Sequence, residues 1–162
     1  MTTREPRPGE VDGREYFFIT QERFDEMVEA GELLEHAGYV NHSYGTPRAY
    51  VEKQLEKGFH VILDIEIQGA RQVHEKMPEA VSIFIMPPSM KELRRRLEGR
   101  GTDSKETIDA RIDRARQEIH EADFYNYLII NEDADQAADQ FRAIMTAEQC
   151  RFCREDLIQF AD

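Results

Sequence analysis

Three short apolar runs separated by helical patterns constrain the fold of this chain more than any other feature. They cover residues 60–64, 81–86 and 127–131, and the first and last end in Asp64 and Asn131. Runs of this length between turn signals are typical of strands buried on both faces. Helical patterns accompany them over residues 69–77, 89–98, 104–125 and 135–160. Because strands that alternate with helices form parallel crossover units, the order predicts an α/β fold from residue 61 onward.

The first 58 residues follow a different pattern. Residues 1–15 are rich in Pro, Gly and charges, residues 16–19 read as a short strand, and Thr20 can cap a helix over residues 21–30. Residues 33–40 look extended, residues 44–47 read as a turn, and a second helix should end at Gly58. We therefore expect a small antiparallel insert ahead of the parallel sheet.

The charge balance narrows the choice of partner. With 33 acidic residues against 21 Lys and Arg, the net charge of −12 argues against nucleic acid or an anionic membrane as a bulk partner. Residues 91–116 nevertheless hold nine basic and six acidic residues. A locally positive segment on an acidic protein favours a small phosphorylated ligand.

The sequence features that bear on localisation favour the cytoplasm. We see no apolar run near the roughly 20 residues of a membrane span, and the first ten residues do not resemble a signal peptide. Cys150 and Cys153 form one C-x-x-C in a charged, helix-like context. One such pair supplies two of the four ligands that structural zinc needs, so two reduced thiols are expected.

The phosphate-binding motif of P-loop kinases does not occur in residues 1–162. None of the nine glycines is followed by Lys and then Ser or Thr, as G-x-x-x-x-G-K-[ST] requires. In such enzymes the backbone N–H groups and the lysine of this loop hold the β- and γ-phosphates of ATP. Asp64, at the end of an apolar run, is nonetheless placed as a magnesium-organising acid would be.

Several unusual motifs occur in a fixed order along almost the whole chain. Glu35 lies between the first two motifs, and Arg111 precedes the last. The motifs are TREPRPGE (3–10), YGT (44–46), LDIEIQG (63–69), FIMPPS (84–89), RLEGRGT (96–102) and INED (130–133). In content, order and spacing the chain resembles the guanylate kinases, a family of P-loop nucleoside monophosphate kinases.

The resemblance implies the fold class and the organisation of the chain. It implies an incomplete P-loop-kinase-like parallel sheet flanked by helices, with a small mixed α/β GMP-binding insert and a helical lid. The GMP-binding region would be 1–58, the core 59–89 and 118–162, and the lid 90–117. The family begins with a strand, a P-loop, a helix and a further strand, a unit of about 30 or more residues. We therefore expect this chain to be N-terminally truncated relative to the family.

The resemblance also implies a reaction and its ligands. The reaction would be GMP + ATP to GDP + ADP in purine nucleotide metabolism, with Mg²⁺ carried by the nucleotide and no metal ligands of the protein's own. The expected partners are GMP and ATP as small molecules, with no nucleic acid and no membrane. The sequence does not determine an oligomeric state.

Candidate site residues follow from the same motifs. Those expected to bind GMP are Arg4, Arg7, Tyr16, Glu35, Tyr44, Thr46, Asp64 and Glu66. Those expected to contact ATP are Arg96, Arg100 and Asn131, and those expected to act in catalysis are Arg100, Arg111 and Asp64. The two N-terminal arginines and the tyrosine hydroxyls would clamp the phosphate. Glu35 would accept from guanine N1–H and the 2-amino group, and Thr46 would donate to O6. Glu66 stands where many members have Asp.

Each of these residues also has a purely structural interpretation. The arginines of residues 1–10 could form an exposed charged loop, Asp64 and Glu66 could make strand-end hydrogen bonds, and Asn131 could initiate a helix. The arginines of residues 94–116 could form i,i+3 and i,i+4 ion pairs on solvated helices, and Arg114 could act either way. Three functions stay open at this point: a kinase, a catalytically inactive module that binds GMP or a protein partner, and a non-functional fragment.

Overall fold

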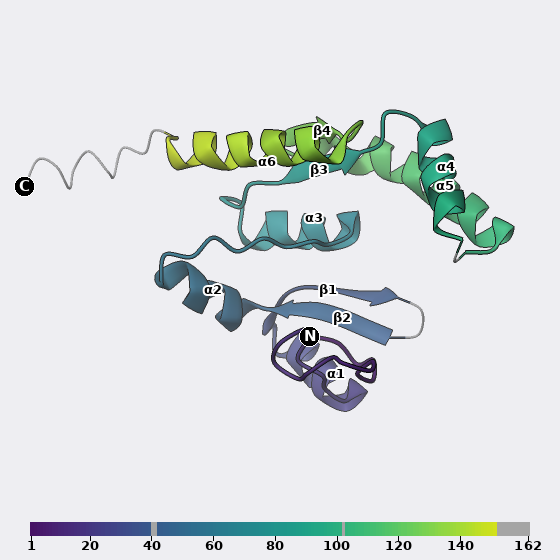
Figure 1. The fold of residues 1–162 in the computed structure, drawn as a ribbon. Helices are drawn as coiled ribbons and strands as arrows, with labels where there is room; N and C mark the ends of the chain where they lie inside the picture. The colour runs from purple at the N-terminus through teal and green to yellow at the C-terminus, as the bar shows by residue number, and fades with distance from the viewer. Residues whose placement is uncertain (40–41, 102, 152–162) are drawn as a thin grey trace, which may run out of the picture. The chain divides into compact units, whose positions relative to one another are not determined.

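The computed structural model describes residues 1–39, 42–101 and 103–151, which form two compact units (Figure 1). The N-terminal unit is Met1–Ala80 and the C-terminal unit is Val81–Asp162. Each contains helices and one two-stranded sheet, so the mixed α/β class predicted from the sequence is confirmed. Among the described residues, no helix combines the length and the apolar character needed to cross a membrane.

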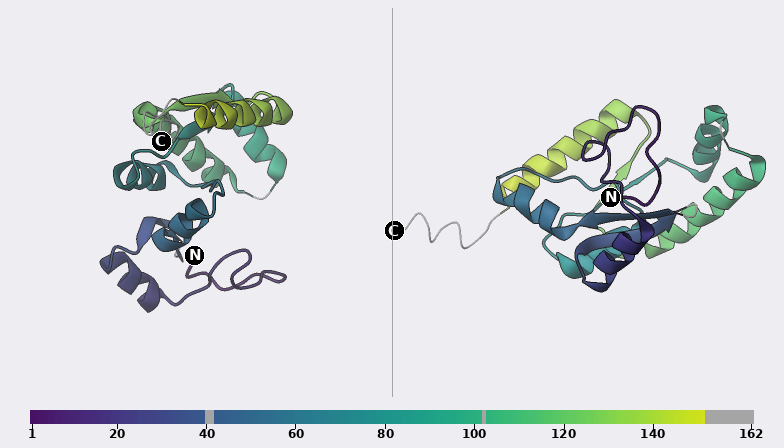
Figure 2. Two further views of the ribbon diagram at one scale, coloured as in Figure 1. Left: turned by 90° about the vertical axis from the view of Figure 1, so that its left-hand side faces the viewer. Right: turned by 90° about the horizontal axis from the view of Figure 1, so that it is seen from below.

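A β-hairpin organises the N-terminal unit. Its elements are α1 (Gln21–Glu29), β1 (Leu33–Tyr39), β2 (His42–Pro47), α2 (Arg48–Glu56) and α3 (Ile67–Lys76). The strands β1 and β2 pair antiparallel, as the expected insert requires. In Figures 1 and 2, α1 and α3 lie on opposite sides of this hairpin. The Thr20 hydroxyl accepts a hydrogen bond from the Arg23 N–H and caps α1, as predicted.

The turn predicted at residues 44–47 is wrong, because these residues belong to β2. Gly45, within this segment, is needed for close packing rather than for a turn. A Cβ at Gly45 would lie 3.0 Å from the Glu35 carbonyl oxygen and 3.0 Å from Leu33 Cδ1. Gly45 therefore lets the hairpin pack closely against Phe24 of α1, and its backbone stays extended. Likewise, residues 16–19 form only isolated bridges and no strand.

A β-bulge near the start of β1 divides its side chains between the two helices. The register shifts between Leu33 and Glu35. Leu33 packs with Phe24 on the α1 side, whereas Leu34 packs with Val73 of α3. In a regular strand Glu35 would share the face of Leu33. The extra residue instead directs Glu35 to the α3 side, a common effect of bulges.

The strand predicted at residues 60–64 is also wrong. No strand among the described residues pairs with this segment, which has no regular secondary structure. Its side chains still alternate. Val61, Leu63 and Ile65 pack against the Leu34 cluster, while Ile62 is 64% exposed. The apolar run therefore has one buried face and one exposed face.

The C-terminal unit contains a parallel strand pair joined by two helices. Its elements are β3 (Ile83–Met86), α4 (Met90–Arg100), α5 (Lys105–Glu121), the 3-10 helix η1 (Ala122–Phe124), β4 (Tyr127–Ile130) and α6 (Ala134–Gln149). Strands β3 and β4 pair in parallel, as the crossover pattern predicts. Leu97, Ile108 and Ile112 form the core between α4 and α5.

The helix ends of this unit follow local signals. Ser89 and Ser104 cap α4 and α5 through their hydroxyls. The helix predicted over residues 89–98 extends further than expected. The helix runs on to Arg100 and ends at Gly101, whose φ of 65° lies in the left-handed region that glycine adopts easily. The part of the predicted last helix beyond residue 151 lies outside the described residues.

Candidate functional site

The loop that carries Arg4 and Arg7 is tied to the hairpin. Thr2 is fully buried, its N–H donates to the Phe17 carbonyl (2.9 Å), and its carbonyl accepts from the Ile19 N–H (3.1 Å). The Thr3 N–H donates to the Ser43 carbonyl of β2 at 3.0 Å. Backbone hydrogen bonds therefore fix the start of the loop. Residues 1–10 are not simply an exposed charged loop, because Thr2 is buried and Thr3 is bonded to the hairpin.

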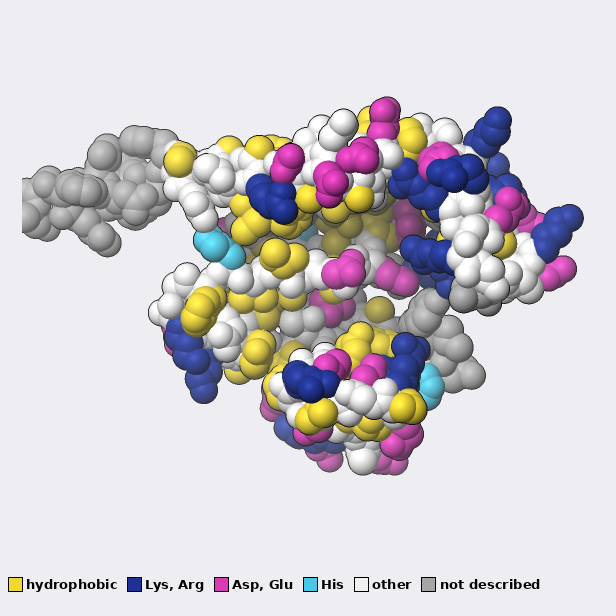
Figure 3. Space-filling view, viewed as in Figure 1, with side chains coloured by type: hydrophobic (Ala, Val, Ile, Leu, Met, Phe, Trp, Pro, Cys, Tyr) yellow, Lys and Arg dark blue, Asp and Glu magenta, His cyan; other side chains and the backbone are white. Residues whose placement is uncertain are grey.

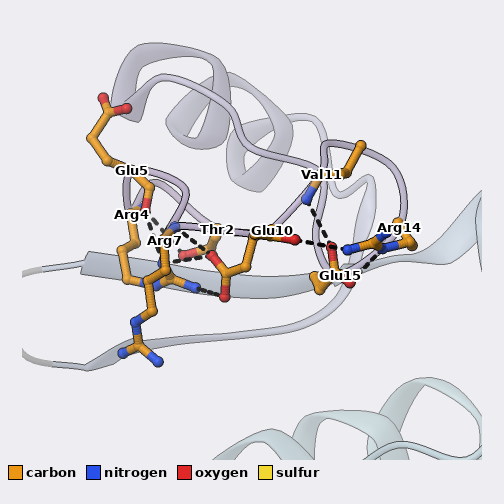
Figure 4. Close-up of polar contacts among 9 residues, drawn as sticks. Thr2, Arg4, Glu5, Arg7, Glu10, Val11, Arg14 and Glu15 are labelled. Atoms are coloured by element: carbon orange, nitrogen blue, oxygen red, sulfur yellow. Dashed lines mark hydrogen bonds and ion pairs between the residues drawn. The ribbon is translucent and has the colours of Figure 1, made fainter.

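Glu10 organises the two arginines of this loop (Figure 4). Both terminal nitrogens of Arg4 donate to the two Glu10 carboxylate oxygens at 2.9 Å, a bidentate pair with side chains only 12% and 17% exposed. The Arg7 backbone N–H donates to the same carboxylate at 2.7 Å. The bond from Arg4, and then that from Arg7, lowers the pKa of Glu10. In Figure 4 the Arg7 guanidinium extends away from this carboxylate and is exposed.

Arg4 also contacts the two tyrosines expected beside it. Its guanidinium carbon lies 5.6 Å from the Tyr16 ring centroid, and the two tyrosine rings meet edge to face at 6.1 Å. Hydrogen bonds to Glu10 and, less strongly, to the Tyr44 hydroxyl raise the pKa of Arg4. We call Arg4, Tyr16 and Tyr44 the Arg4 cluster. It places a permanent cation beside phenol groups, a combination suited to an anion.

Glu35 and Thr46 meet directly across the hairpin. They are register partners, and the Thr46 hydroxyl donates to Glu35 Oε1 at 2.7 Å. Glu35 is only 5% exposed, which is unusual for a carboxylate. Tyr44 and Thr46 are two residues apart on β2 and so share a face of the hairpin. The Glu35–Thr46 pair and the Arg4 cluster therefore occupy neighbouring positions on one face.

Asp64 and Glu66 lie on the exposed face of the segment that precedes α3. The buried residues of this segment are the odd-numbered ones, so the two carboxylates share the opposite side, as their spacing predicts. Glu66 is also the N-cap residue of α3. Both side chains are exposed to solvent, where a ligand could reach them.

The arginines expected to act as a lid lie on α4 and α5, where Figure 3 shows Lys and Arg side chains gathered. Arg96 is held on two sides: Nε donates to Glu92 Oε1 (2.7 Å) and a terminal nitrogen to the Glu132 carbonyl (3.1 Å). Arg111 pairs with Asp103 at 3.6 Å, and Arg100 is exposed at the end of α4. Arg114 bonds Glu118 four residues away, the solvated pairing considered above.

Asn131 follows β4 and borders an open hollow of about 370 Å³. Its N–H donates to the Met86 carbonyl at 2.7 Å, so the backbone extends the strand pair by one residue. Asp133, not Asn131, caps α6. The hollow is lined by Ile85, Asn131, Ala134, Ala137, Ala138, Phe141 and Arg142. Cys150 is an exposed free thiol, while Cys153 lies outside the described residues.

Sequence reasoning missed the residues that hold the candidate groups in place. Glu10 orients Arg4, and Glu92 orients Arg96. Gln72 of α3 binds both backbone groups of His36, next to Glu35. The i,i+4 spacing of Glu92 and Arg96 was a usable signal. Nothing local marks Gln72, because its partner lies 36 residues away.

The comparisons with known proteins agree on one family. The family model for guanylate kinase matches residues 1–148. A guanylate kinase of Streptococcus thermophilus is 52% identical over 151 residues, which cover 93% of this chain and 72% of that protein. One of Caldanaerobacter subterraneus is 52% identical over 153 residues, or 94% of this chain and 74% of its own length.

A solved structure is similar as well. The crystal structure of guanylate kinase from Anaplasma phagocytophilum has a TM-score of 0.75 and 42% sequence identity, and the match covers 94% of this chain and 75% of that one. The matched residues include the Arg4 cluster, the Glu35–Thr46 pair and the α4–α5 arginines. The chain therefore belongs to the guanylate kinase family of nucleotide-binding phosphotransferases.

Proposed function

We propose that this chain takes part in the transfer of the γ-phosphoryl group of ATP to GMP, giving GDP and ADP. The observation that carries the proposal is the buried Glu35 carboxylate, paired with Thr46 on the same hairpin face as Tyr44. It supports a site that reads a nucleobase beside a site that holds an anion.

Guanine is the base that this pair fits. Its N1–H and 2-amino groups form a donor pair that a single carboxylate accepts, and adenine offers no such pair. Glu35 is buried, so binding a base without these donors would leave its charge poorly solvated. Sites of this kind reject the wrong ligand strongly. Thr46 now donates to Glu35 and would turn its hydroxyl proton to guanine O6.

The Arg4 cluster would hold the phosphate of GMP. Arg4 donates to both Glu10 carboxylate oxygens, to the Glu5 carbonyl and to the Tyr44 hydroxyl, and its guanidinium has five N–H donors in all. The Tyr16 and Tyr44 hydroxyls would add donors, and the exposed Arg7 guanidinium would swing in as the second cation. This arrangement favours a dianion over a neutral group.

Magnesium would arrive with the nucleotide. Mg²⁺ usually keeps several waters and binds one or two carboxylates together with phosphates. The exposed Asp64 and Glu66 fit that need, and the described residues contain no cluster of three or more metal-binding side chains. When bound, the ion would neutralise phosphate charge. Asp64 and Glu66 would orient its waters and face the monophosphate.

The remaining contacts would come from the C-terminal unit. Arg100 and Arg111 would stabilise charge on the transferring phosphoryl group, a mainly electrostatic task. Arg96 would contact the ATP phosphates, and Asn131 would contact the adenine at the edge of the open hollow beside it. Residues 1–162 contain no G-x-x-x-x-G-K-[ST] motif, which supports a second candidate, a module that binds GMP without transfer.

Calorimetry with GMP and AMP tests the guanine site. Glu35→Gln replaces one acceptor by a donor and should weaken GMP binding about 10–100-fold, the value of a charged hydrogen bond. AMP binding should change little. Glu29→Gln, on the exposed end of α1, is the control. An unchanged GMP-to-AMP ratio in Glu35→Gln would refute guanine reading, and GDP formation measured separately distinguishes transfer from binding.

A further inference from the structure

A glycine of α3 lies against the carboxylate of Glu35. Gly69 is the third residue of the helix and is buried. A Cβ at this position would lie 2.8 Å from Glu35 Oε2 and 3.4 Å from its carboxyl carbon. Real Cβ atoms almost never come closer than 3.0 Å to another heavy atom. Gly69 has an ordinary helical backbone, so the glycine is needed for space.

The helix is fixed where it approaches this strand. Gln72 accepts from the His36 N–H (3.2 Å) and donates to the His36 carbonyl (2.8 Å). Lys76 Nζ donates to the Leu33 carbonyl at 3.0 Å. Positions 69, 72 and 76 lie on one face of a helix, so α3 is docked along β1 on both sides of Glu35. The helix cannot retreat from Glu35 without losing these bonds.

The carboxylate is the part that can move. Among the described residues, Glu35 Oε1 accepts a hydrogen bond from the Thr46 hydroxyl, and the side chain ends in rotatable bonds. A methyl group at position 69 would therefore displace the carboxylate and leave the backbone in place. We infer that Gly69 is a specificity-determining residue: its missing side chain leaves Glu35 in the position from which it reads guanine. This inference rests on the proposed function of Glu35.

Stability and specificity should separate in the variant Gly69→Ala. Alanine is a better helix former than glycine, so α3 itself gains from the substitution. The melting temperature should stay the same or rise, while the preference for GMP over AMP falls about tenfold or more. A glycine needed only for folding would produce the opposite combination, a lower melting temperature with an intact preference.

The experiment is calorimetric titration of residues 1–162 with GMP and with AMP, alongside thermal unfolding. Gly38→Ala is the matched control, because Gly38 lies on the same strand as Glu35 and an added Cβ there meets nothing within 4 Å. If the unsubstituted chain does not prefer GMP, the proposed guanine site fails and the inference with it. If it does prefer GMP and Gly69→Ala keeps the ratio within about twofold, only the inference fails.

Double variants test whether Gly69 acts through Glu35. In a Glu35→Ala background, Gly69→Ala should leave the GMP-to-AMP ratio unchanged, because contacting residues couple in such a cycle. A further tenfold change there would overturn the inference. If Gly69→Ala lowers the melting temperature, the double variant Gly69→Ala/Glu35→Asp shows whether the added methyl group clashes with Glu35. The shorter carboxylate restores stability if the clash involves Glu35, and a melting temperature that stays low overturns the inference.

Discussion

Glu10 both neutralises and positions Arg4, and these two effects oppose each other when a phosphate binds. The Glu10 carboxylate would repel a phosphate that binds to Arg4, and solvent and salt would screen part of this repulsion. The carboxylate also supplies two bonds to Arg4 and one to the Arg7 backbone. Because these charge-assisted bonds fix Arg4 and the loop in one arrangement, we expect positioning to outweigh repulsion.

Glu10→Ala should therefore weaken GMP binding about tenfold and leave guanosine binding unchanged, because guanosine carries no phosphate. Titration with both ligands checks this. Glu5→Ala is the control, since the neighbouring Glu5 side chain is exposed and Arg4 contacts only its backbone carbonyl. Equal losses for GMP and guanosine would show instead that the loop had unfolded.

Glu92 carries a pH prediction. Hydrogen bonds from Arg95 and then Arg96 lower the pKa of Glu92 from its usual 4.5 to about 2. A depressed carboxyl pKa gives stability that is present above pH 4.5 and is lost as the pH falls toward 2. The Glu92 carboxyl carbon should therefore titrate near pH 2 by NMR. Arg95→Gln should move that midpoint upward, and a midpoint near 4.5 in the unsubstituted chain would show that the pair does not form.

At the scale of elements, α3 depends on Gln72 for its place beside β1. Gln72→Leu removes both bonds to His36 and leaves a partly buried N–H and carbonyl without this partner. The free energy of unfolding of the N-terminal unit should fall by about 1–3 kcal/mol. Denaturant unfolding measures it. Gln68→Leu on the exposed side of α3 should change little, and an equal effect of the two substitutions would contradict this role.

The β3–β4 pair exposes apolar side chains, and we expect them to promote association between copies of this chain. Leu128 is 58% exposed and Ile130 is 48% exposed, on the same face of β4. Within the described residues, neither strand has a second partner. Exposed strands of this kind pair with other copies of a chain. Leu128→Thr/Ile130→Thr should shift sedimentation toward monomer, whereas Ile119→Thr on α5 should not.

Elements whose ends are set by local chemistry could be predicted from the sequence. Thr20 caps α1 as predicted, and Ser89 and Ser104 cap the helices predicted over residues 89–98 and 104–125. The errors concern residues whose role depends on a distant neighbour. The turn predicted around Gly45 is wrong because the close packing of Phe24 and Leu33 at this glycine depends on residues far from it in the sequence.

The same division holds for the candidate site. Arg4, Tyr44 and Thr46 could be named from motifs of the family, and Glu35 from its place between two of them. The hydrogen bond between Glu35 and Thr46 could not, because it depends on a register that a bulge shifts by one residue. Residues 60–64 were expected to be a strand for a related reason. Apolar character predicts burial, but a strand also needs a hydrogen-bonding partner.

For the whole molecule, the main prediction concerns turnover. Residues 1–162, supplied with GMP, ATP and Mg²⁺, should form GDP far more slowly than the roughly 1–100 s⁻¹ of ordinary kinases. Phosphoryl transfer depends on positioning, and these residues lack the glycine-rich loop and lysine that hold the β- and γ-phosphates. A coupled assay for ADP measures it. Ordinary turnover would mean that another part of the chain holds those phosphates.

The bulge beside Leu34 makes this hairpin sensitive to length in a way that few surface strands are. Deletion of the codon for Leu34 would remove the bulge and make the pairing of β1 with β2 regular. Glu35 would stay opposite Thr46, but the Leu34 side chain, which packs with Val51 and Val73, would be lost from the core of the N-terminal unit. Among descendants of this gene, we therefore expect residue 34 to vary in identity among apolar side chains, while deletions and insertions between residues 33 and 35 are eliminated by selection.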